Sequence, residues 1–361
     1  MRVARNASRR PVTQPSVGRC HFSGYAIGSG LCRSRGEGNT VPSGRAAEER
    51  SPAILAIGMV SIDHYVRVTS LPRTDEKVNG VRIGWFVGGM AANFAVAARQ
   101  FCPRSQLIST FGDDPESTAA HSDLQTRGID TSGCIKVPDA NSLSSLTLID
   151  GNADRVMAIL DSNLPLPDAE FCTSEVASSA WDIVYAVALD AEWCRVIGST
   201  AQKTGAMVAF DLEPFFIAAT WGTSDFAAMM ESAHLVFLKM ESARLAGFAE
   251  AAHAAKALQE MGPQVVIVTD GPGSIYCLAE ETRFSVTPPK VHVVDPTGAG
   301  DAFAGAFCGL YAQRRPVAEC LVKATAIGGL AVSELGCQTY APVRSDLFDS
   351  ICQKVQVARL P

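Results

Sequence analysis

Short runs of apolar residues recur along this chain, and segments with helical patterning separate them. Runs of about five apolar residues between helices are typical of parallel strands that are buried on both faces. The pattern predicts a doubly wound α/β domain over residues 51–361, with a mainly parallel sheet. The predicted strands are residues 53–58, 106–110, 182–187, 207–211, 234–238 and 265–269.

Two segments break this rhythm, residues 64–87 and 142–160, in which apolar and polar residues alternate. Each contains a turn signal, Asn79-Gly80 in the first and Asp150-Gly151-Asn152 in the second. An Asx-Gly pair between alternating runs indicates a β-hairpin. Four strands cannot bury a face by themselves, so we expect a small sheet that projects from the edge of the main one. This sheet would serve as a lid, as a dimer contact, or as both.

Composition narrows the classes of function. The formal net charge of −6 argues against a nucleic-acid or acidic-membrane surface, and no apolar run approaches the roughly eighteen residues of a membrane span. The eleven cysteines form no CxxC pair. They indicate reduced, mostly buried thiols and a cytoplasmic location, with neither a disulfide framework nor a zinc site.

The first fifty residues differ from the rest of the chain. They carry nine arginines, no lysine and no acid before Glu37, and they show no hydrophobic periodicity. Such a segment cannot bury enough apolar surface to order itself. Residues 1–50 are therefore predicted to be a disordered tail or an over-extended start of the reading frame. An organellar transit peptide is the alternative, because it would also be rich in arginine and poor in acids.

The segment 293–307, with the sequence VVDPTGAGDAFAGAF, carries the clearest chemical signal. It predicts a strand at 291–294, a glycine turn and then a helix. The main-chain N–H groups of Gly298, Ala299 and Gly300 would have no helical acceptor, and the helix dipole adds positive charge there. The turn is therefore a predicted anion site, suited to a phosphoryl group in transfer.

Asp301 follows this turn directly and would be placed to accept a proton from an attacking hydroxyl. The alternative is that Asp301 only caps the helix, since Asp is a favoured cap.

Other nucleotide-binding and hydrolase motifs do not match the spacing of residues in this sequence. A dinucleotide fingerprint would need a glycine at position 303, where Phe303 stands, and no Walker A, GxSxG or HExxH pattern occurs.

The stretch DPTGAGDAFAGAF, together with GGMAAN and an early GMVSID, resembles the ribokinase-like carbohydrate kinase family, also called PfkB. The resemblance extends nearly continuously over residues 53–355. It implies ATP-dependent phosphorylation of a sugar or nucleoside hydroxyl, with a lid of β-strands over the sugar. By position, Asp301 would be the catalytic base, and the glycine turn would be the anion hole.

The resemblance also assigns a sugar side to the site. Asp63 matches the acid that binds sugar hydroxyls, and a carboxylate that accepts two neighbouring hydroxyls is a suitable polyol anchor. Gly88, Gly89 and Asn93 match sugar-binding positions at the start of a helix over 89–101. Asp190 stands at the end of a predicted strand that faces the expected pocket. Each of these residues could instead be purely structural.

The nucleotide side is assigned to the segment 269–274, TDGPGS, where family members place their nucleotide. Thr269, Gly271 and Gly273 are the candidates, and a plain hairpin turn is the alternative. Lys239 could face a phosphate.

Metal ions are also implied by the resemblance. Asp211 and Glu213, with Glu241 as an alternative, would order magnesium waters, although the asparagine of the family's usual Asn-x-x-Glu element is missing. Asp295 and Thr297, with carbonyls of the segment 331–340, resemble the site that holds a monovalent cation such as potassium in many relatives.

These observations predict an ATP-dependent sugar kinase with Mg²⁺ as cofactor and K⁺ as a further candidate. Its partners would be ATP and a ketohexose, modified hexose or pentose, with a homodimer formed through the lid sheet. Two alternatives stay open. One is a nucleoside kinase of the same family, and the other is a non-catalytic sugar-binding regulator on the same scaffold, which would be expected to lose the acid at position 301.

Overall fold

The computed structural model describes residues 50–160 and 162–361. Residues 50–361 form one compact unit. The tail predicted for residues 1–50 lies outside the described residues except for Arg50, whose Nη2 lies 3.0 Å from Oδ2 of Asp182 in an ion pair. Among the described helices, none is both long and apolar enough to cross a membrane.

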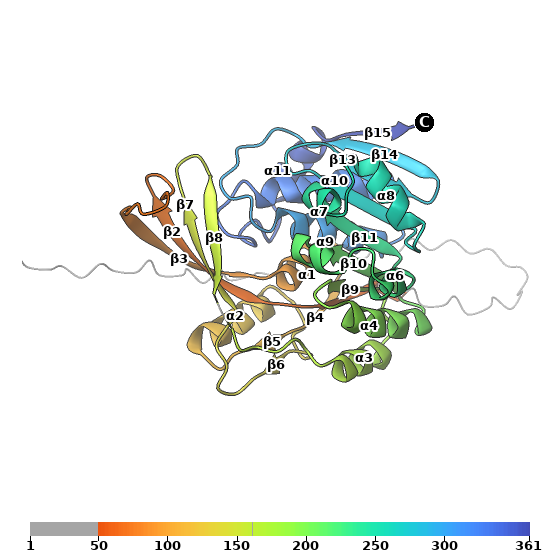
Figure 1. Cartoon of the computed structure of the whole chain (residues 1–361), viewed down its shortest axis with the longest axis horizontal. Helices are drawn as coiled ribbons and strands as arrows, with labels where there is room; N and C mark the ends of the chain where they lie inside the picture. Colours follow the sequence, from red (N-terminus) through yellow and green to blue (C-terminus); the bar gives the residue numbers. More distant parts are fainter. Residues whose placement is uncertain (1–49, 161) are drawn as a thin grey trace, which may run out of the picture. The chain divides into compact units, whose positions relative to one another are not determined.

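A nine-stranded sheet forms the centre of the unit, and all six strands predicted from apolar runs belong to it. The pairs from β4 through β12 are parallel, and β13, β14 and β15 extend the sheet as antiparallel strands. The predicted doubly wound, mainly parallel sheet is thus confirmed (Figure 1). In sheet order the strands are β15 (Gln356–Leu360), β14 (Thr282–Thr287), β13 (Ile275–Ala279), β12 (Val265–Thr269), β11 (Leu235–Lys239), β10 (Met207–Leu212), β9 (Ile183–Val187), β1 (Ala53–Ile57) and β4 (Arg104–Ile108).

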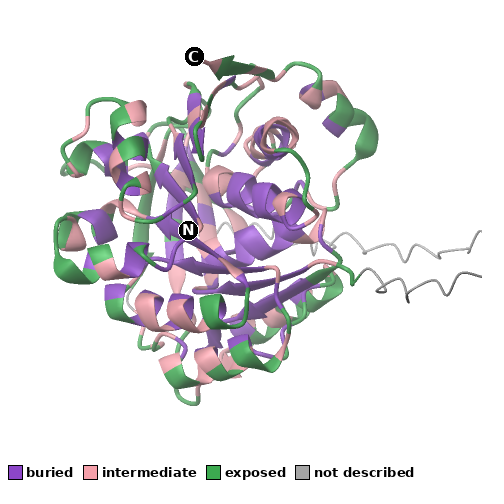
Figure 2. Cartoon of the chain, turned by 90° about the vertical axis from the view of Figure 1, so that its right-hand side faces the viewer, coloured by how far each residue is buried: buried purple, intermediate pink, exposed green. Residues whose placement is uncertain are grey.

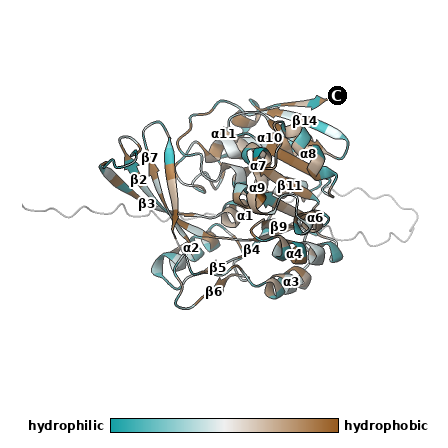
Figure 3. Ribbon diagram, viewed as in Figure 1, coloured by the Kyte–Doolittle hydropathy of each residue, from teal (hydrophilic) through white to brown (hydrophobic). Residues whose placement is uncertain are grey.

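Helices cover both faces of this sheet, so its strands are buried on both sides (Figure 2). Alternate residues of β1 show the two layers, because Ile54 belongs to one hydrophobic core and Leu55 to the other. In Figure 3 the central strands accordingly carry mostly hydrophobic residues. The first core is built with α1 (Met90–Arg99), α2 (Pro115–Thr126), α9 (Ala299–Tyr311), α10 (Val317–Ala331) and α11 (Ser345–Cys352). The second is built with α3 (Ala169–Ser178), α4 (Ala191–Lys203), α5 (Pro214–Thr220), α6 (Ser224–Met230), α7 (Met240–Leu245) and α8 (Ala251–Gln259).

The two segments predicted as hairpins combine into a separate four-stranded sheet, the lid sheet (Figure 1). Its order is β3 (Gly80–Gly88), β2 (Ser61–Val68), β7 (Ser144–Ile149) and β8 (Arg155–Leu160), and the central pair β2–β7 is parallel. A further short pair consists of β5 (Thr110–Phe111) and β6 (Ile135–Lys136). The predicted small projecting sheet is therefore present.

One of the two predicted turns is wrong. Strands β7 and β8 are joined across residues 150–154, as expected, but β2 and β3 are joined by residues 69–79 and not by a tight Asn79-Gly80 turn. The ladder ends where Val68 pairs with Gly80, and Pro72, which could not donate to a ladder, lies in the connection. The sequence signal at Asn79-Gly80 marks only the start of β3.

The strand predicted at 291–294 is also absent. The main-chain N–H groups of Val294 and Asp295 donate instead to the carbonyl of Val332, at 2.7 and 3.2 Å. Val332 is the C-terminal cap of α10. The main chain at Val294 and Asp295 is thus satisfied at a helix end and not in a sheet.

Helices α1 and α9 pack unusually closely. A side chain at Gly305 of α9 would overlap the carbonyl oxygen of Phe94 in α1, and one at Gly309 would lie 2.9 Å from the carbonyl oxygen of Ala98. The alanine-rich face of α1 completes the contact. Small residues on both helices therefore allow the two backbones to approach each other.

A Gly305→Ala substitution should destabilise the protein by about 1–3 kcal/mol, because the new methyl group must push the two helices apart. The free energy of unfolding in urea measures this. Gly329→Ala in α10 is the matched control, since the nearest atom to its new Cβ would be 3.7 Å away. Equal stability of the two variants would contradict the close contact.

Candidate active site

The site lies where the parallel strands end. Asp211 stands near the end of β10, Lys239 ends β11 and Thr269 ends β12. The register pairs Lys239 directly with Thr269. Because the carboxyl ends of parallel strands share one edge, side chains from distant parts of the sequence meet there, and ligands commonly bind at this edge in open α/β sheets.

Residues 298–300, which we call the anion turn, open helix α9. Gly298 is the N-terminal cap with φ 75° and ψ 0°, a left-handed conformation that suits glycine. A side chain there would lie 2.8 Å from Cβ of Cys337 and 3.0 Å from Nδ2 of Asn93. Among the residues that the structure describes, the atom nearest to a Cβ added at Gly300 is Cε of Lys239, at 3.8 Å. The free first-turn amides of α9 therefore lie beside a lysine, a favourable setting for an anion.

Asp301 follows the anion turn and is 7% exposed. Its Oδ2 accepts a hydrogen bond of 2.8 Å from Nδ2 of Asn93 in α1. Asn93 in turn accepts one of 2.9 Å from Nε2 of Gln338. Asp301 makes no capping hydrogen bond, because the cap position is occupied by Gly298. The alternative role as a helix cap is therefore not what the geometry shows.

Burial raises the pKa of Asp301 to about 7. The hydrogen bond from Asn93 and the charge of Lys239 oppose this rise, whereas the carboxylates of Glu213 and Asp63 add to it. A general base works best when its pKa lies near the working pH. The surroundings of Asp301 thus give it the protonation behaviour of a base at neutral pH.

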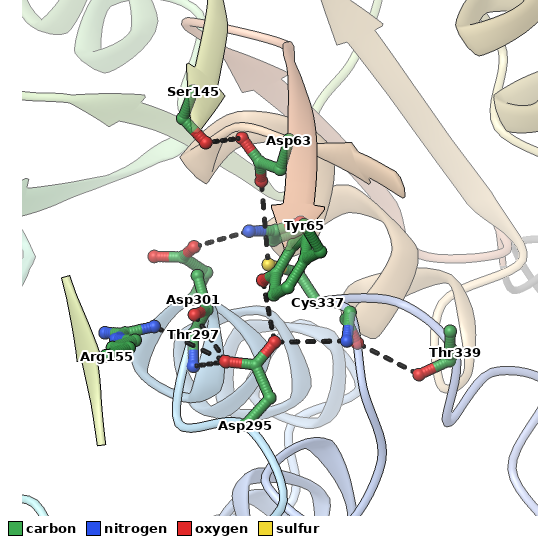
Figure 4. A network of polar contacts seen from close by, with 11 residues as sticks. Asp63, Tyr65, Ser145, Arg155, Asp295, Thr297, Asp301, Cys337 and Thr339 are labelled. Atoms are coloured by element: carbon green, nitrogen blue, oxygen red, sulfur yellow. Dashed lines mark hydrogen bonds and ion pairs between the residues drawn. The ribbon is translucent and has the colours of Figure 1, made fainter. Parts of the chain in front are cut away.

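Asp63 lies on the same side, on lid strand β2, and is 4% exposed. Its Oδ1 accepts hydrogen bonds from the hydroxyls of Ser61 and Ser145, at 2.9 and 2.8 Å. Burial raises the pKa of Asp63, although these two serines oppose the rise. Figure 4 shows Asp63 and Asp301 in the same network, with Sγ of Cys337 3.9 Å from Oδ2 of Asp63.

The two glycines predicted for the sugar side keep the backbone close to this acid. A side chain at Gly88 would overlap Oδ2 of Asp63, and one at Gly89 would lie 2.5 Å from the carbonyl oxygen of Met59. Gly89 caps α1 with φ 90°. The predicted residues Asp63, Gly88, Gly89 and Asn93 therefore gather around Asp301.

Asp190 does not join this group. It is exposed, and it caps helix α4 by accepting a hydrogen bond of 2.8 Å from the main-chain N–H of Trp193. An Asp three residues before such an N–H group is a common N-terminal cap. Asp190 was predicted at a strand end facing the pocket, but β9 ends at Val187, and the Asp190 carboxylate caps the helix that follows.

Lys239 connects the anion turn to the predicted magnesium residues. Its Nζ lies 3.0 Å from Oε1 of Glu213 in an ion pair. Burial of the Lys239 side chain lowers its pKa. The neighbouring carboxylates, Glu213 most strongly, have the larger combined effect, so the net pKa of Lys239 is raised.

Asp211 is 7% exposed and accepts a hydrogen bond of 3.5 Å from Tyr185. Burial, with the charge of Glu213, holds the pKa of Asp211 well above its usual range.

The fit of these acids to magnesium can be judged from the donor set. Within residues 50–160 and 162–361 no three His, Cys, Asp or Glu side chains form a ready-made metal cluster. Mg²⁺ commonly takes only one or two carboxylates and completes its shell with water and phosphate oxygens. Asp211 and Glu213, beside Lys239 and the anion turn, fit that pattern.

The predicted nucleotide segment is the connection between β12 and the antiparallel β13. It turns through Gly271, with φ 54°, and the N–H of Gly273 donates to the carbonyl of Asp270 at 2.8 Å. The hairpin turn is therefore real. Thr269 still lies next to Lys239 at the carboxyl edge, so a nucleotide role for Thr269, Gly271 and Gly273 stays a prediction.

The residues predicted for a monovalent cation are already engaged. The Asp295 carboxylate is fully buried and accepts hydrogen bonds from Thr297, from Tyr65 and from the N–H of Gly336. Arg155, from the lid, forms an ion pair with it (Figure 4). This donor set does not fit a cation bound through the Asp295 side chain.

Several polar residues of the site were not predicted. Gln338, Cys337 and Ser145 contact Asn93 or Asp63. The resemblance pointed to the segment 331–340 only for its carbonyls, and the hairpin pattern of 142–160 singled out no side chain. Within the described residues, Oε1 of Gln338 and Oγ1 of Thr147 are buried and lack a hydrogen-bond partner. Buried polar atoms usually have partners, so these two are suited to meet a polar ligand.

A buried acid beside the first-turn amides of a helix and a lysine is an arrangement that suits phosphoryl transfer. Residues 51–344 match the family described as pfkB family carbohydrate kinase. The match covers most of the chain, and the protein belongs to this family.

Individual relatives agree with this assignment. The chain is 26% identical to a nucleoside kinase from Methanothermobacter thermautotrophicus over 292 residues, which are 80% of this chain and 92% of that protein. It is 24% identical to the ribokinase of Mus musculus over 315 residues, covering 83% and 95% of the two chains. The structure of Arabidopsis thaliana ribokinase complexed with ribose and ATP is similar with a TM-score of 0.68 at 20% identity, covering 84% of this chain and 99% of that one.

The value of kcat/KM should fall as the pH drops through about 7, because Asp301 then binds a proton and can no longer accept one.

Asn93→Ala removes the hydrogen bond that favours the charged carboxylate of Asp301. The acid limb of the pH profile should therefore move upward by about 1–2 units. Asn152→Ala, in the exposed lid turn, is the control. An unchanged limb in Asn93→Ala would contradict the link between Asn93 and Asp301.

Proposed function

We propose that this protein is a kinase that transfers the γ-phosphoryl group of ATP to a hydroxyl of a small carbohydrate, namely a ketohexose, a modified hexose or a pentose. The observation that carries the proposal is the position of Asp301. It is buried directly after the anion turn and is held by Asn93 on the side where Asp63 lies. A base and an anion site side by side are what transfer of phosphate to an alcohol requires.

Each group of residues has a separate part in this reaction. Asp63 and Asn93 bind the hydroxyls of the acceptor, and Asp301 takes the proton of the hydroxyl that attacks. The amides of the anion turn hold the negative charge that develops on the phosphoryl group, and Lys239 adds a positive charge beside them.

The lid sheet would exclude water from the reacting groups. Mg²⁺, held through Asp211 and Glu213 with water and phosphate oxygens, would neutralise phosphate charge.

A nucleoside acceptor is the second candidate, and one feature favours it. Ile159 on β8 pairs with Ser145, which binds Asp63, so Ile159 lies next to the expected hydroxyl anchor. Ile159 also lines an apolar cavity of about 220 Å³ with Met59, Leu164 and Pro165, among others. An acceptor with an apolar or planar substituent would fill that cavity. A non-catalytic regulator is disfavoured because the acid at position 301 is present.

We also propose that the protein is cytoplasmic and forms a homodimer through the outer face of the lid sheet. Nine cysteines of the described residues are free, as reducing surroundings would leave them. Asp63 and Tyr65 of β2 point toward the site, so their neighbours along the strands face outward. Trp85, Leu146 and Val156 lie on that outer face and are 37%, 37% and 51% exposed. A second copy would cover them.

An Asp301→Asn variant should lose about two to four orders of magnitude in kcat, the usual contribution of a general base, because the amide cannot accept the proton. ATP binding should persist, since the anion turn is unchanged. ATP consumption is measured with a panel of ketohexoses, pentoses, sugar acids and nucleosides, and nucleotide binding by calorimetry. Near-normal turnover by Asp301→Asn would refute the assignment of the base, and turnover of nucleosides alone would favour the second candidate.

A Val156→Lys variant should convert the dimer into a monomer, because a charge would then lie in the covered apolar face. Light scattering coupled to size exclusion measures the mass. Val81→Lys is the control, since Val81 is 71% exposed and pairs with Arg67, on the face opposite to Val156. A wild-type protein that is monomeric at micromolar concentration would refute the dimer.

A further inference from the structure

Asp295 joins the lid sheet to the anion turn. Its side chain has no exposed area, and it accepts hydrogen bonds from four uncharged donors. Oδ1 accepts from the N–H and the hydroxyl of Thr297, at 2.9 and 2.5 Å. Oδ2 accepts from the hydroxyl of Tyr65 at 2.7 Å and from the N–H of Gly336 at 3.1 Å. The two carboxylate oxygens are thus surrounded by donors from three separate segments (Figure 4).

Arg155 supplies the positive charge for this carboxylate. It is the first residue of lid strand β8, and its Nη1 lies 3.5 Å from Oδ1 of Asp295. In the part of the chain that the structure describes, it is the one cationic side chain in an ion pair with Asp295. A buried carboxylate without a positive partner is strongly unfavourable, so the ion pair with Arg155 compensates the burial of Asp295.

The carbonyl oxygens near Asp295 are also engaged. The carbonyl of Val332 accepts from two main-chain N–H groups, those of Val294 and Asp295. The carbonyls of Leu335 and Gly336 both accept from the hydroxyl of Thr339, at 3.0 and 2.9 Å. A bound alkali cation needs oxygens that replace its hydration shell. Here those oxygens already accept hydrogen bonds, and the Asp295 carboxylate already has Arg155 as a positive partner.

We propose that the guanidinium of Arg155 takes, at Asp295, the place that a monovalent cation would occupy, so that this kinase works without added potassium. Arg155 is then a positioning residue. It stabilises Asp295, Asp295 holds Thr297, and Thr297 precedes the anion turn directly. The proposal rests on the kinase function proposed above, because the turn it positions is the predicted anion hole.

The same contacts couple the lid to the turn. Arg155 and Tyr65 come from lid strands β8 and β2, whereas Asp295 and Thr297 belong to the segment that leads into α9. When the lid docks, both of its side chains reach the same carboxylate. Arg155 and Tyr65 therefore support the anion turn, through Asp295, only when the lid is in place. The turn would then reach its geometry for phosphoryl transfer at the same time as the lid excludes water.

The first test compares cations. Wild-type activity in buffer with tetramethylammonium as the only monovalent cation should change less than about twofold when K⁺ is added, since the charge at Asp295 is already provided. Arg155→Met keeps the length of the side chain but removes its charge. Its kcat should fall about ten-fold or more, because a displaced turn positions the phosphoryl group poorly. K⁺ should restore part of this loss, and Arg155→Lys should be less impaired than Arg155→Met.

The exposed Arg73→Met, in the connection between β2 and β3, is the matched control and should behave as the wild type with and without K⁺. Three kinetic results would overturn the proposal. The first is a loss of activity in Arg155→Met without any rescue by K⁺, which a merely structural role of Arg155 would give. The second is a wild-type enzyme that K⁺ activates severalfold, and the third is an Arg155→Met variant with full kcat and no response to K⁺.

A second readout does not depend on activity. K⁺ should raise the melting temperature of Arg155→Met, because an ion that binds only the folded state stabilises it, and should leave that of the wild type unchanged. If no sugar or nucleoside is phosphorylated, the proposed function fails, yet this thermal shift still reports on the site at Asp295. A K⁺-dependent shift in the wild type would overturn the replacement of the cation by Arg155.

Discussion

The close contact between helices α1 and α9 is the constraint on which the site depends. Gly305 and Gly309 remove the side chains that would separate the two backbones, so α9 lies directly against the carbonyls of α1. Asn93 of α1 can then reach Asp301 of α9 with a hydrogen bond of 2.8 Å. Bulkier residues at this contact would move the base away from its orienting amide, even though neither glycine touches a reacting group.

Buried negative charge is the second constraint. Asp63, Asp211, Asp295 and Asp301 are all buried near the carboxyl edge of the sheet and the lid, and each needs compensation. They receive different kinds. Hydroxyls satisfy Asp63, a lid arginine pairs with Asp295, and Asp301 has only an amide and a nearby lysine. Burial raises the pKa of Asp301 to about 7, because the amide and the lysine offset it only in part, and this value suits a base that must exchange its proton in each turnover.

Local sequence patterns predicted some elements better than others. The six apolar runs became strands because a parallel sheet buries both faces of such runs. The β-branched residues at 291–294 gave the same signal, but the main chain at Val294 donates to the end of α10 and not to a strand. The Asn79-Gly80 pair also misled, since the ladder ends where Val68 pairs with Gly80, and the connection from 69 to 79 is longer than a tight turn. Asp190 shows the same limit for site residues, because an Asp after a strand caps the next helix as readily as it faces a pocket.

The sequence alone determined the sheet, the glycine turn with its following acid, and the family resemblance, because these depend on residues close together in the chain. It could also single out Asp63 and Asn93 by their motifs. Only the tertiary structure decided what surrounds them: the Arg155–Asp295 pair joins residues 140 positions apart, and the contact of Gln338 with Asn93 joins residues 245 apart. Such partners leave no local pattern, because they meet only after the lid, the helices and the C-terminal loops have packed together.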